Sequence, residues 1–241
     1  MARRMLAFVV PPLEGPPTGG TRYNRRLVAA LRQRGAAPQV LTLAQAREAV
    51  TQDRAATLWV DSLWMEALPA LAAAAAAPCR VGLLTHYLPV LVSHGEAPDP
   101  SRLSPPERAA LQHAHGLLAP SDYLAKELRA LGVEDERVRV LEPGNELPIE
   151  PRPAPDPSAG PLRAVVIANV TEGKGVEPLL EHLARHLAPS DGLELEVVGS
   201  LEMEPACARR CVALVEDRPA LRGRVRLGGA RPHRTCIEAL L

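Results

Sequence analysis

Residues 6–35 read LAFVVPPLEGPPTGGTRYNRRLVAALRQRG, and they predict a strand, a loop and a helix in that order. The apolar run at residues 6–10 is short enough for a buried strand and leads into a loop rich in Pro and Gly. The helix is predicted over residues 23–34, with Gly35 as its C-cap. This order is typical of a parallel sheet whose strands are joined by crossover helices.

The same alternation continues through residue 150. Ser121 is expected to cap the last helix of this part. Further strands are predicted at residues 39–43, 57–60, 81–85, 116–119 and 138–141. Six such strands and their helices predict a doubly wound, Rossmann-like α/β domain over residues 1–150, with ligands bound where loops leave the carboxyl ends of the strands.

A proline-rich segment then interrupts the pattern. Residues 150–161 read EPRPAPDPSAGP, and we interpret residues 151–161 as a semi-rigid linker. Beyond it, strands are predicted at 163–168, 195–198 and 224–227, and helices at 176–187 and 205–216. Because a full domain of this class needs about 150 residues, we expect residues 162–241 to form a partial second Rossmann-like domain, less stable than residues 1–150.

Composition narrows the classes of function. Lys plus Arg equals Asp plus Glu at 28 each, and aromatic residues make up 2%, so we expect no nucleic-acid partner. No apolar run approaches the roughly 20 residues of a membrane span, and the amino-terminal run is too short for a signal peptide. The four cysteines form no CxxC pair, and we expect a reduced, cytoplasmic setting.

Two glycine-rich segments are candidate phosphate sites. Gly19 and Gly20 precede a helix, where backbone N–H groups and the helix dipole favour an anion. The alternative is an ordinary flexible turn, which the spacing alone favours. Lys174 lies between Gly173 and Gly175 at a second helix start, and it suits a diphosphate. A solvated surface lysine is the alternative there.

Histidines and arginines supply the other candidates. His86 follows a predicted strand, and its imidazole can orient or polarise a sugar hydroxyl, although a lone histidine is more often structural. His182 and His186 are four residues apart, but the sequence indicates no third ligand, so no metal site is predicted. The arginines of the first helix predict a solvated face, with contact to an anionic membrane as the alternative.

Four segments resemble glycosyltransferase family 4 of the GT-B fold, in the order that the family has them. The first domain contributes GGTRYNRRLVAALRQRG and APSDYLAKELRALGVEDERVRVLEPGNE. The second contributes ANVTEGKGVEPLL, and VVGSLEMEPACARRC followed by RVRLGGA. The resemblance implies transfer of a sugar from a nucleotide-diphosphate donor, bound between two domains, to a carbohydrate or lipid-linked acceptor. It also implies retention of configuration, with no metal and no cofactor.

The resemblance further implies roles for single residues. Gly19 and Gly20 line the donor diphosphate, His86 sits beside the transferred sugar or the acceptor, Lys174 offsets the charge of the leaving diphosphate, and Gly199 borders the nucleotide.

Two departures from the family pattern stand out. Asn169 occupies the position of a frequent arginine, and the resemblance implies that it binds the donor phosphate. Its amide can donate a hydrogen bond there but brings no charge. The E-x7-E segment of the family is expected beyond Leu241, so we expect this chain to be truncated in its second domain. A catalytically inactive GT-B-like binding or accessory protein is therefore the alternative function. Peripheral contact with the inner face of the membrane is a further expectation.

Overall fold

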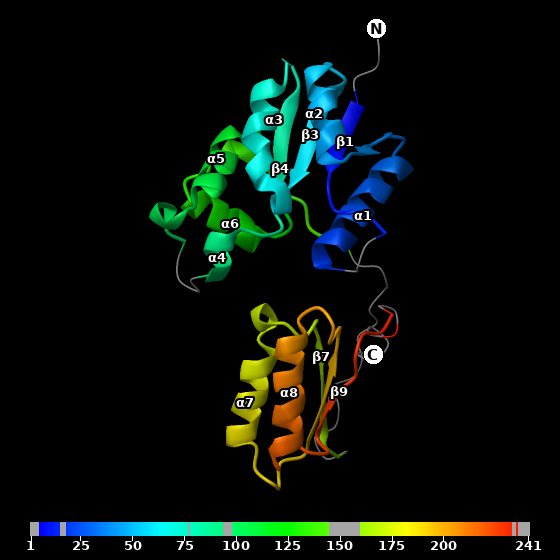
Figure 1. Cartoon of the computed structure of the whole chain (residues 1–241), viewed down its shortest axis with the longest axis vertical. Helices are drawn as coiled ribbons and strands as arrows, with labels where there is room; N and C mark the ends of the chain where they lie inside the picture. The colour runs from blue at the N-terminus through cyan, green and yellow to red at the C-terminus, as the bar shows by residue number, and fades with distance from the viewer. Residues whose placement is uncertain are drawn as a thin grey trace. The chain divides into compact units, whose positions relative to one another are not determined.

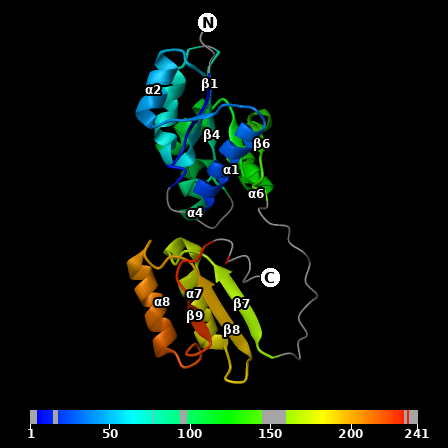
Figure 2. The same ribbon diagram turned by 90° about the vertical axis from the view of Figure 1, so that its right-hand side faces the viewer.

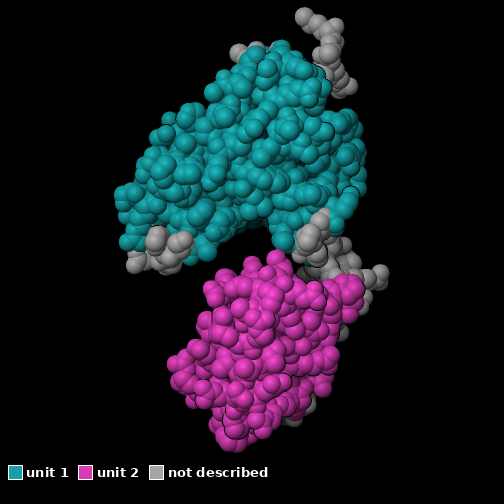
Figure 3. Space-filling view, in the orientation of Figure 1, with its two compact units in different colours: residues 1–147 teal, residues 148–241 magenta. Residues whose placement is uncertain are grey.

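The computed structural model describes residues 5–14, 18–76, 78–93, 98–144, 160–232 and 235. The chain divides into two compact units, residues 1–147 and 148–241 (Figure 3). The linker predicted at residues 151–161 lies outside the described residues, apart from Gly160 and Pro161. The domain limits predicted from the sequence therefore stay a prediction, and each unit is described by itself.

The first unit is built on one parallel six-stranded sheet with the strand order β2-β1-β3-β4-β5-β6. Figure 1 labels its strands β1, β3 and β4. The strands are β1 (Met5–Val9), β2 (Gln39–Val40), β3 (Ala55–Asp61), β4 (Arg80–Leu84), β5 (Leu117–Ala119) and β6 (Val138–Val140). Every neighbouring pair is parallel. The predicted α/β fold with a parallel sheet is confirmed.

Helices connect these strands. The α-helices are α1 (Gly19–Gln33), α2 (Leu43–Thr51), α3 (Leu68–Ala74), α4 (Pro89–Ser93), α5 (Pro105–His113) and α6 (Asp122–Ala130). Three short 3-10 helices complete the unit, namely η1 (Ser62–Ala67), η2 (Pro100–Arg102) and η3 (Asp135–Arg137). The hydroxyl of Ser121 accepts a hydrogen bond from the Leu124 N–H at the start of α6, which confirms the predicted cap.

Two predicted boundaries were wrong because N-caps move the helix starts. The strand predicted at 39–43 ends at Val40, since Thr42 and Gln45 form a capping box that begins α2. The first helix begins at Gly19 rather than at residue 23, because the Thr18 hydroxyl accepts from the Thr21 N–H. Gly19 and Gly20 are thus the first turn of α1.

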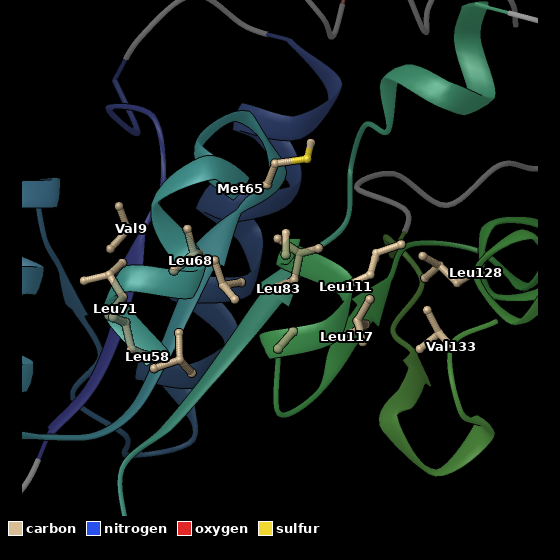
Figure 4. Close-up of a cluster of buried hydrophobic side chains, with 14 of the residues drawn as sticks. Val9, Leu58, Met65, Leu68, Leu71, Leu83, Leu111, Leu117, Leu128 and Val133 are labelled. Atoms are coloured by element: carbon tan, nitrogen blue, oxygen red, sulfur yellow. The ribbon is translucent and has the colours of Figure 1, made fainter. Parts of the chain in front are cut away.

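Side chains of the central strands alternate between two hydrophobic clusters, as the two-residue period of a strand requires. Val9 belongs to the larger cluster, which α2, α3, α5 and α6 complete, and Figure 4 shows it packed with Leu58, Leu71 and Leu83. Phe8 belongs to the smaller cluster, which α1 completes through Val28. Helices therefore cover both faces of the sheet.

The smaller cluster contains one tight contact. A Cβ atom built on Gly82 would lie 2.4 Å from Cζ3 of Trp59, its register partner on β3. The indole thus occupies the space that any side chain at position 82 would need.

The second unit has a parallel sheet of β7 (Leu162–Ile167), β8 (Leu193–Val198) and β9 (Val225–Leu227) in that order. The helices α7 (Val176–His186) and α8 (Pro205–Asp217) lie side by side against it (Figures 1 and 2). A 3-10 turn, η4 (Glu172–Lys174), precedes α7. Leu180, Val197, Cys207 and Cys211 are central to this core.

Candidate functional site

The order of the first sheet locates a switch point between β1 and β3. The chain leaves β1 toward β2 on one side and continues from β3 toward β4 on the other. Ligands of doubly wound sheets bind at the carboxyl ends of strands where such a reversal occurs. The segments at this edge are the start of α1, the start of η1 and the residues that follow β4.

The amino-terminal end of α1 carries two glycines, and neither the packing nor the backbone conformation there requires glycine. A Cβ atom on Gly19 would meet no atom within 4 Å, and one on Gly20 would lie 3.5 Å from the imidazole of His86, an ordinary contact. Neither glycine has a positive φ. The first turn of α1 contains no acidic residue, so its N–H groups and positive dipole end stay suited to an anion.

His86 is fixed in place by its backbone and by its ring. Its N–H donates to the hydroxyl of Ser62 at 3.1 Å, and its Nε2 atom lies 2.9 Å from the amide oxygen of Asn24. The ring meets that of Tyr23 edge to face, with centroids 4.9 Å apart. The structure therefore places two predicted site residues, Gly20 and His86, as neighbours, with room for about one methyl group between them.

Two buried polar residues in this group were missed by the sequence reasoning. Asn24 donates from Nδ2 to Oδ2 of Asp61 at 2.8 Å, and each residue is 1% exposed. Asp61 is the last residue of β3 and also caps η1 by accepting from the Leu63 N–H at 3.0 Å. An acidic residue directly after the apolar end of a central strand is the signal that would have found Asp61.

Burial and charge act in opposite directions on the imidazole. Burial lowers the pKa of His86 below its ordinary value of 6.5, while the Asp61 carboxylate, 3.8 Å from Nε2, raises it by a smaller amount. The net effect is a lowered pKa. Near neutral pH the ring is therefore uncharged, which suits a hydrogen-bonding group. Burial also raises the pKa of the neighbouring Tyr23 hydroxyl, to about 12.

Asn169 and Gly199 meet at the carboxyl edge of the second sheet. The amide oxygen of Asn169 accepts from the Ser200 N–H at 3.0 Å. A Cβ atom on Gly199 would lie 1.9 Å from the carbonyl oxygen of Ala168, so only glycine fits there. Both residues thus have a structural role in joining the ends of β7 and β8.

Lys174 ends the η4 turn and is exposed. Among the described residues, no acidic group forms an ion pair with it. Gly175 follows with φ +68°, a left-handed conformation that favours glycine. The predicted GKG segment is therefore a turn that ends in a left-handed glycine and begins α7, with its cation free to meet an anion.

The turn that carries Lys174 is anchored by α8. Arg210 donates from Nε and Nη2 to both carboxylate oxygens of Glu177, at 2.7 and 2.8 Å, and from Nη2 to Glu172 at 2.9 Å. The carboxylate of Glu204, just before α8, accepts from the Glu172 N–H at 3.1 Å. Two side chains of the α8 region therefore hold the first residue of η4.

The remaining candidates show no sign of a metal or redox site. Across the described ranges, no group of three or more His, Cys, Asp and Glu side chains is placed to hold a metal ion. The rings of His182 and His186 lie close together, with centroids 4.4 Å apart and planes tilted by 38°. Burial raises the pKa of the Cys211 thiol to about 12, so it stays protonated. None of the described helices has the length and apolar character that a membrane crossing requires.

Comparison with known proteins shows what the chain is similar to. Residues 43–144 match the sequence profile of the glycosyl transferase 4-like domain, from α2 to just beyond β6. No curated protein sequence matches the chain.

Solved structures share the fold at low identity. HepE from Anabaena in complex with UDP-glucose has 15% identity and a TM-score of 0.62, covering 95% of this chain and 69% of HepE. MnaA from S. aureus with UDP has 14% identity and a TM-score of 0.59, covering 98% of this chain and 71% of MnaA. A glycosyltransferase from Rickettsia africae has 13% identity and a TM-score of 0.58, covering 96% and 69%. Residues 43–144 are thus similar to a glycosyl transferase 4-like domain, and the chain has the GT-B fold of these solved structures.

Proposed function

We propose that this protein transfers a sugar from a nucleotide-diphosphate donor to a hydroxyl group of a carbohydrate or lipid-linked acceptor, in the cytoplasm. The transfer retains the anomeric configuration and uses no metal. Residues 1–150 are the acceptor-side domain, residues 151–161 the linker, and residues 162–241 belong to the nucleotide-sugar side. The glycosyl transferase 4-like match and the UDP-glucose complex of HepE support a nucleotide sugar as the donor.

The observation that carries the proposal is the glycine start of α1 beside His86. Gly19 and Gly20 have neither a steric nor a conformational need to be glycine. What their missing side chains provide is access to the backbone N–H groups at the positive end of a helix of 15 residues. A diphosphate bound there has its attached sugar close to the imidazole.

Leaving-group charge is the main electrostatic problem of the reaction. Breaking the bond between the sugar and the phosphate leaves negative charge on the diphosphate, and groups placed in advance to meet that charge lower the barrier. In this proposal, the positive end of the α1 dipole is one source of the stabilisation, and the ammonium of Lys174 is a second, each tested by its own variant. The uncharged His86 ring contacts a hydroxyl group of the sugar or acceptor.

Lys174 offers the sharpest test, because Lys126 is the only other lysine and makes a matched control. Both side chains are exposed, so neither change disturbs a core. Binding of UDP and UDP-glucose is measured by calorimetry for the parent, Lys174→Ala and Lys126→Ala. We expect Lys174→Ala to weaken both ligands roughly tenfold, about 1.4 kcal/mol, and Lys126→Ala to leave both unchanged. Equal affinity of parent and Lys174→Ala removes Lys174 from the donor site.

Transfer itself is tested by following UDP release from UDP-glucose in the presence of candidate carbohydrate and lipid-linked acceptors. The anomeric configuration of the product, read by NMR, tests retention. Addition of EDTA tests metal independence, because a metal-dependent reaction would stop. An inverted product or loss of activity in EDTA contradicts the corresponding part of the proposal.

A second candidate function is donor or acceptor binding without transfer. It is favoured by Asn169, whose amide oxygen is used to hold the Ser200 N–H and which brings no charge to the leaving group. In that case UDP-glucose binds with the Lys174 dependence described above, but no acceptor releases UDP.

A further inference from the structure

A continuous row of buried polar groups connects β3, α1 and the segment after β4. Asp61 Oδ2 lies 2.8 Å from Asn24 Nδ2, and Asn24 Oδ1 lies 2.9 Å from His86 Nε2. The Asp61 and Asn24 side chains are almost fully buried, and that of His86 is 13% exposed. The three residues are far apart in the sequence and meet only because β1, β3 and β4 are adjacent.

The chemistry of the row fixes the direction of each hydrogen bond. Both carboxylate oxygens of Asp61 face N–H donors, Oδ1 the backbone N–H of Leu63 and Oδ2 the amide of Asn24. Asn24 must therefore turn its NH₂ group toward Asp61 and its oxygen toward His86. An amide oxygen only accepts, so the proton of the neutral imidazole lies on Nε2.

The other ring nitrogen is left as an acceptor. Nδ1 of a neutral Nε2–H imidazole carries a lone pair, and in the described part of the chain it has no hydrogen-bond partner. The groups that face the ring are the Asp61 carboxylate from β3, and Tyr23 and Gly20 from α1. None of the printed contacts of these groups involves Nδ1.

We propose that Asp61 and Asn24 are positioning residues, which hold His86 with Nε2 as a donor and so present Nδ1 as a hydrogen-bond acceptor to a sugar hydroxyl. The ligand in this statement rests on the proposed function, whereas the arrangement of protons does not. If Asp61 and Asn24 only filled space in the core, their substitution would not change which ring nitrogen of His86 carries the proton.

The substitution Asp61→Asn tests the row without changing its shape. The new amide oxygen can still accept from Leu63, but its NH₂ group then faces Asn24. Asn24 must turn over to offer its oxygen to that group, and its own NH₂ group then points at His86. Nε2 becomes the acceptor and the proton moves to Nδ1. We therefore expect the ring tautomer to invert.

The tautomer is measured from the ¹⁵N shifts of labelled histidine in the full chain, with His86 assigned by the signals lost in His86→Gln. The parent should show Nε2–H and Asp61→Asn should show Nδ1–H. Glu66→Gln, an exposed change within η1, is the matched control and should leave the parent tautomer in place. A parent ring with the proton on Nδ1, or an Asp61→Asn ring that keeps it on Nε2, overturns the proposal.

If Asp61→Asn does not fold, Asn24→Asp decides the same question. The new carboxyl group lies beside the buried Asp61, so the two carboxyl groups share one proton. The oxygen that faces His86 still accepts, which keeps the ring proton on Nε2. A shift of the ring proton to Nδ1 in Asn24→Asp contradicts the proposed row of hydrogen bonds.

Ligand addition separates this inference from the proposed function. UDP-glucose should move the Nδ1 signal of the parent, whereas UDP, which lacks the sugar, should not. Absence of UDP-glucose binding refutes the proposed function. The tautomers of the parent and of Asp61→Asn still test whether Asp61 and Asn24 set the position of the His86 proton. Binding of UDP-glucose with no movement of Nδ1 refutes the assigned contact alone.

Discussion

Gly199 lies so close to Ala168 that a Cβ atom built on it would be 1.9 Å from the Ala168 carbonyl oxygen and 2.7 Å from the following amide nitrogen. Both obstacles are backbone atoms, in a segment that backbone hydrogen bonds hold on both sides of the contact. The Ala168 N–H donates to Val198 at 3.0 Å, and the Gly199 N–H donates to Gly229 at 2.9 Å. The end of the second sheet therefore closes only around a residue without a side chain.

Gly199→Ala should accordingly destabilise the second unit. Overpacking against atoms that are free to move costs about 1–3 kcal/mol, and here the neighbour is hydrogen-bonded backbone, so we expect about 3 kcal/mol. Denaturant unfolding followed by circular dichroism measures the loss. Gly173→Ala is the control in the same unit, because its Cβ would meet no atom within 4 Å. Equal stability of the two variants would contradict the packing role.

Gly19→Ala should leave the stability of the protein intact but weaken its binding of UDP. A Cβ at position 19 meets open space and alanine favours helix, so the free energy of unfolding should stay the same or rise by up to about 1 kcal/mol. Affinity for UDP should nevertheless fall roughly tenfold, about 1.4 kcal/mol, because the methyl group occupies the approach to the helix end. Gly116→Ala, whose Cβ would make ordinary contacts at 3.7 Å, should leave affinity unchanged. Parent-like affinity in Gly19→Ala argues against the phosphate site.

The lowered pKa of His86 predicts a pH dependence of stability. Unfolding lets the ring take up a proton near its ordinary pKa of 6.5, whereas the folded chain resists this until lower pH, because burial disfavours the charged ring. The stability that the neutral ring contributes is therefore complete above about pH 6.5, and it is lost as the pH falls toward the folded pKa.

Unfolding free energies of the parent and of His86→Gln, measured between about pH 8 and pH 5, give the difference in slope. We expect the parent to lose more stability, by at most about 1.4 kcal/mol per pH unit for the one proton. His113→Gln, which changes an exposed histidine, is the control and should keep the parent slope. Superimposable curves for the parent and His86→Gln would mean that the ring is not buried as described.

Arg210→Ala should loosen the turn that carries Lys174. The hydrogen bond from Arg210 holds the pKa of Glu177 below its usual value, so the variant should raise that pKa toward normal. Amides of residues 172–175 should also exchange with solvent faster. The stability effect should be small and should disappear in high salt, because the pair is exposed. Arg209→Ala, its exposed neighbour, should change neither observable.

The sequence carried enough information for the sheet but not for the contacts at its edge. Apolar runs bounded by Pro and Gly placed nearly every strand within two residues, because strand cores must be buried. Caps shifted the ends: Thr42 cut one predicted strand short, and Thr18 moved Gly19 and Gly20 into the helix. A side chain that can either extend a strand or cap a helix has no local signal that decides between them.

Of the candidate site, the sequence placed His86 correctly at the end of a strand, yet Asn24 and Asp61 went unnoticed. They are 37 residues apart and meet because β3 lies beside β1, a pairing that no local pattern encodes. Gly199 was selected for the nucleotide, while its contact with Ala168 follows from the pairing of β7 with β8. The contacts of these residues therefore depend on which strands pair across the sheet, and local secondary-structure propensity does not predict them.

The packing of Trp59 across Gly82 has an optical consequence. The chain has two tryptophans, Trp59 and Trp64, and both lie in the first unit. Emission excited selectively from tryptophan therefore reports on residues 1–147 alone, while far-ultraviolet dichroism sees the helices of both units. If the second unit melts first, as the sequence predicts, the ellipticity will begin to change while the emission spectrum is still that of a folded indole. The chain thus carries an intrinsic fluorophore for one half of the molecule, without any label.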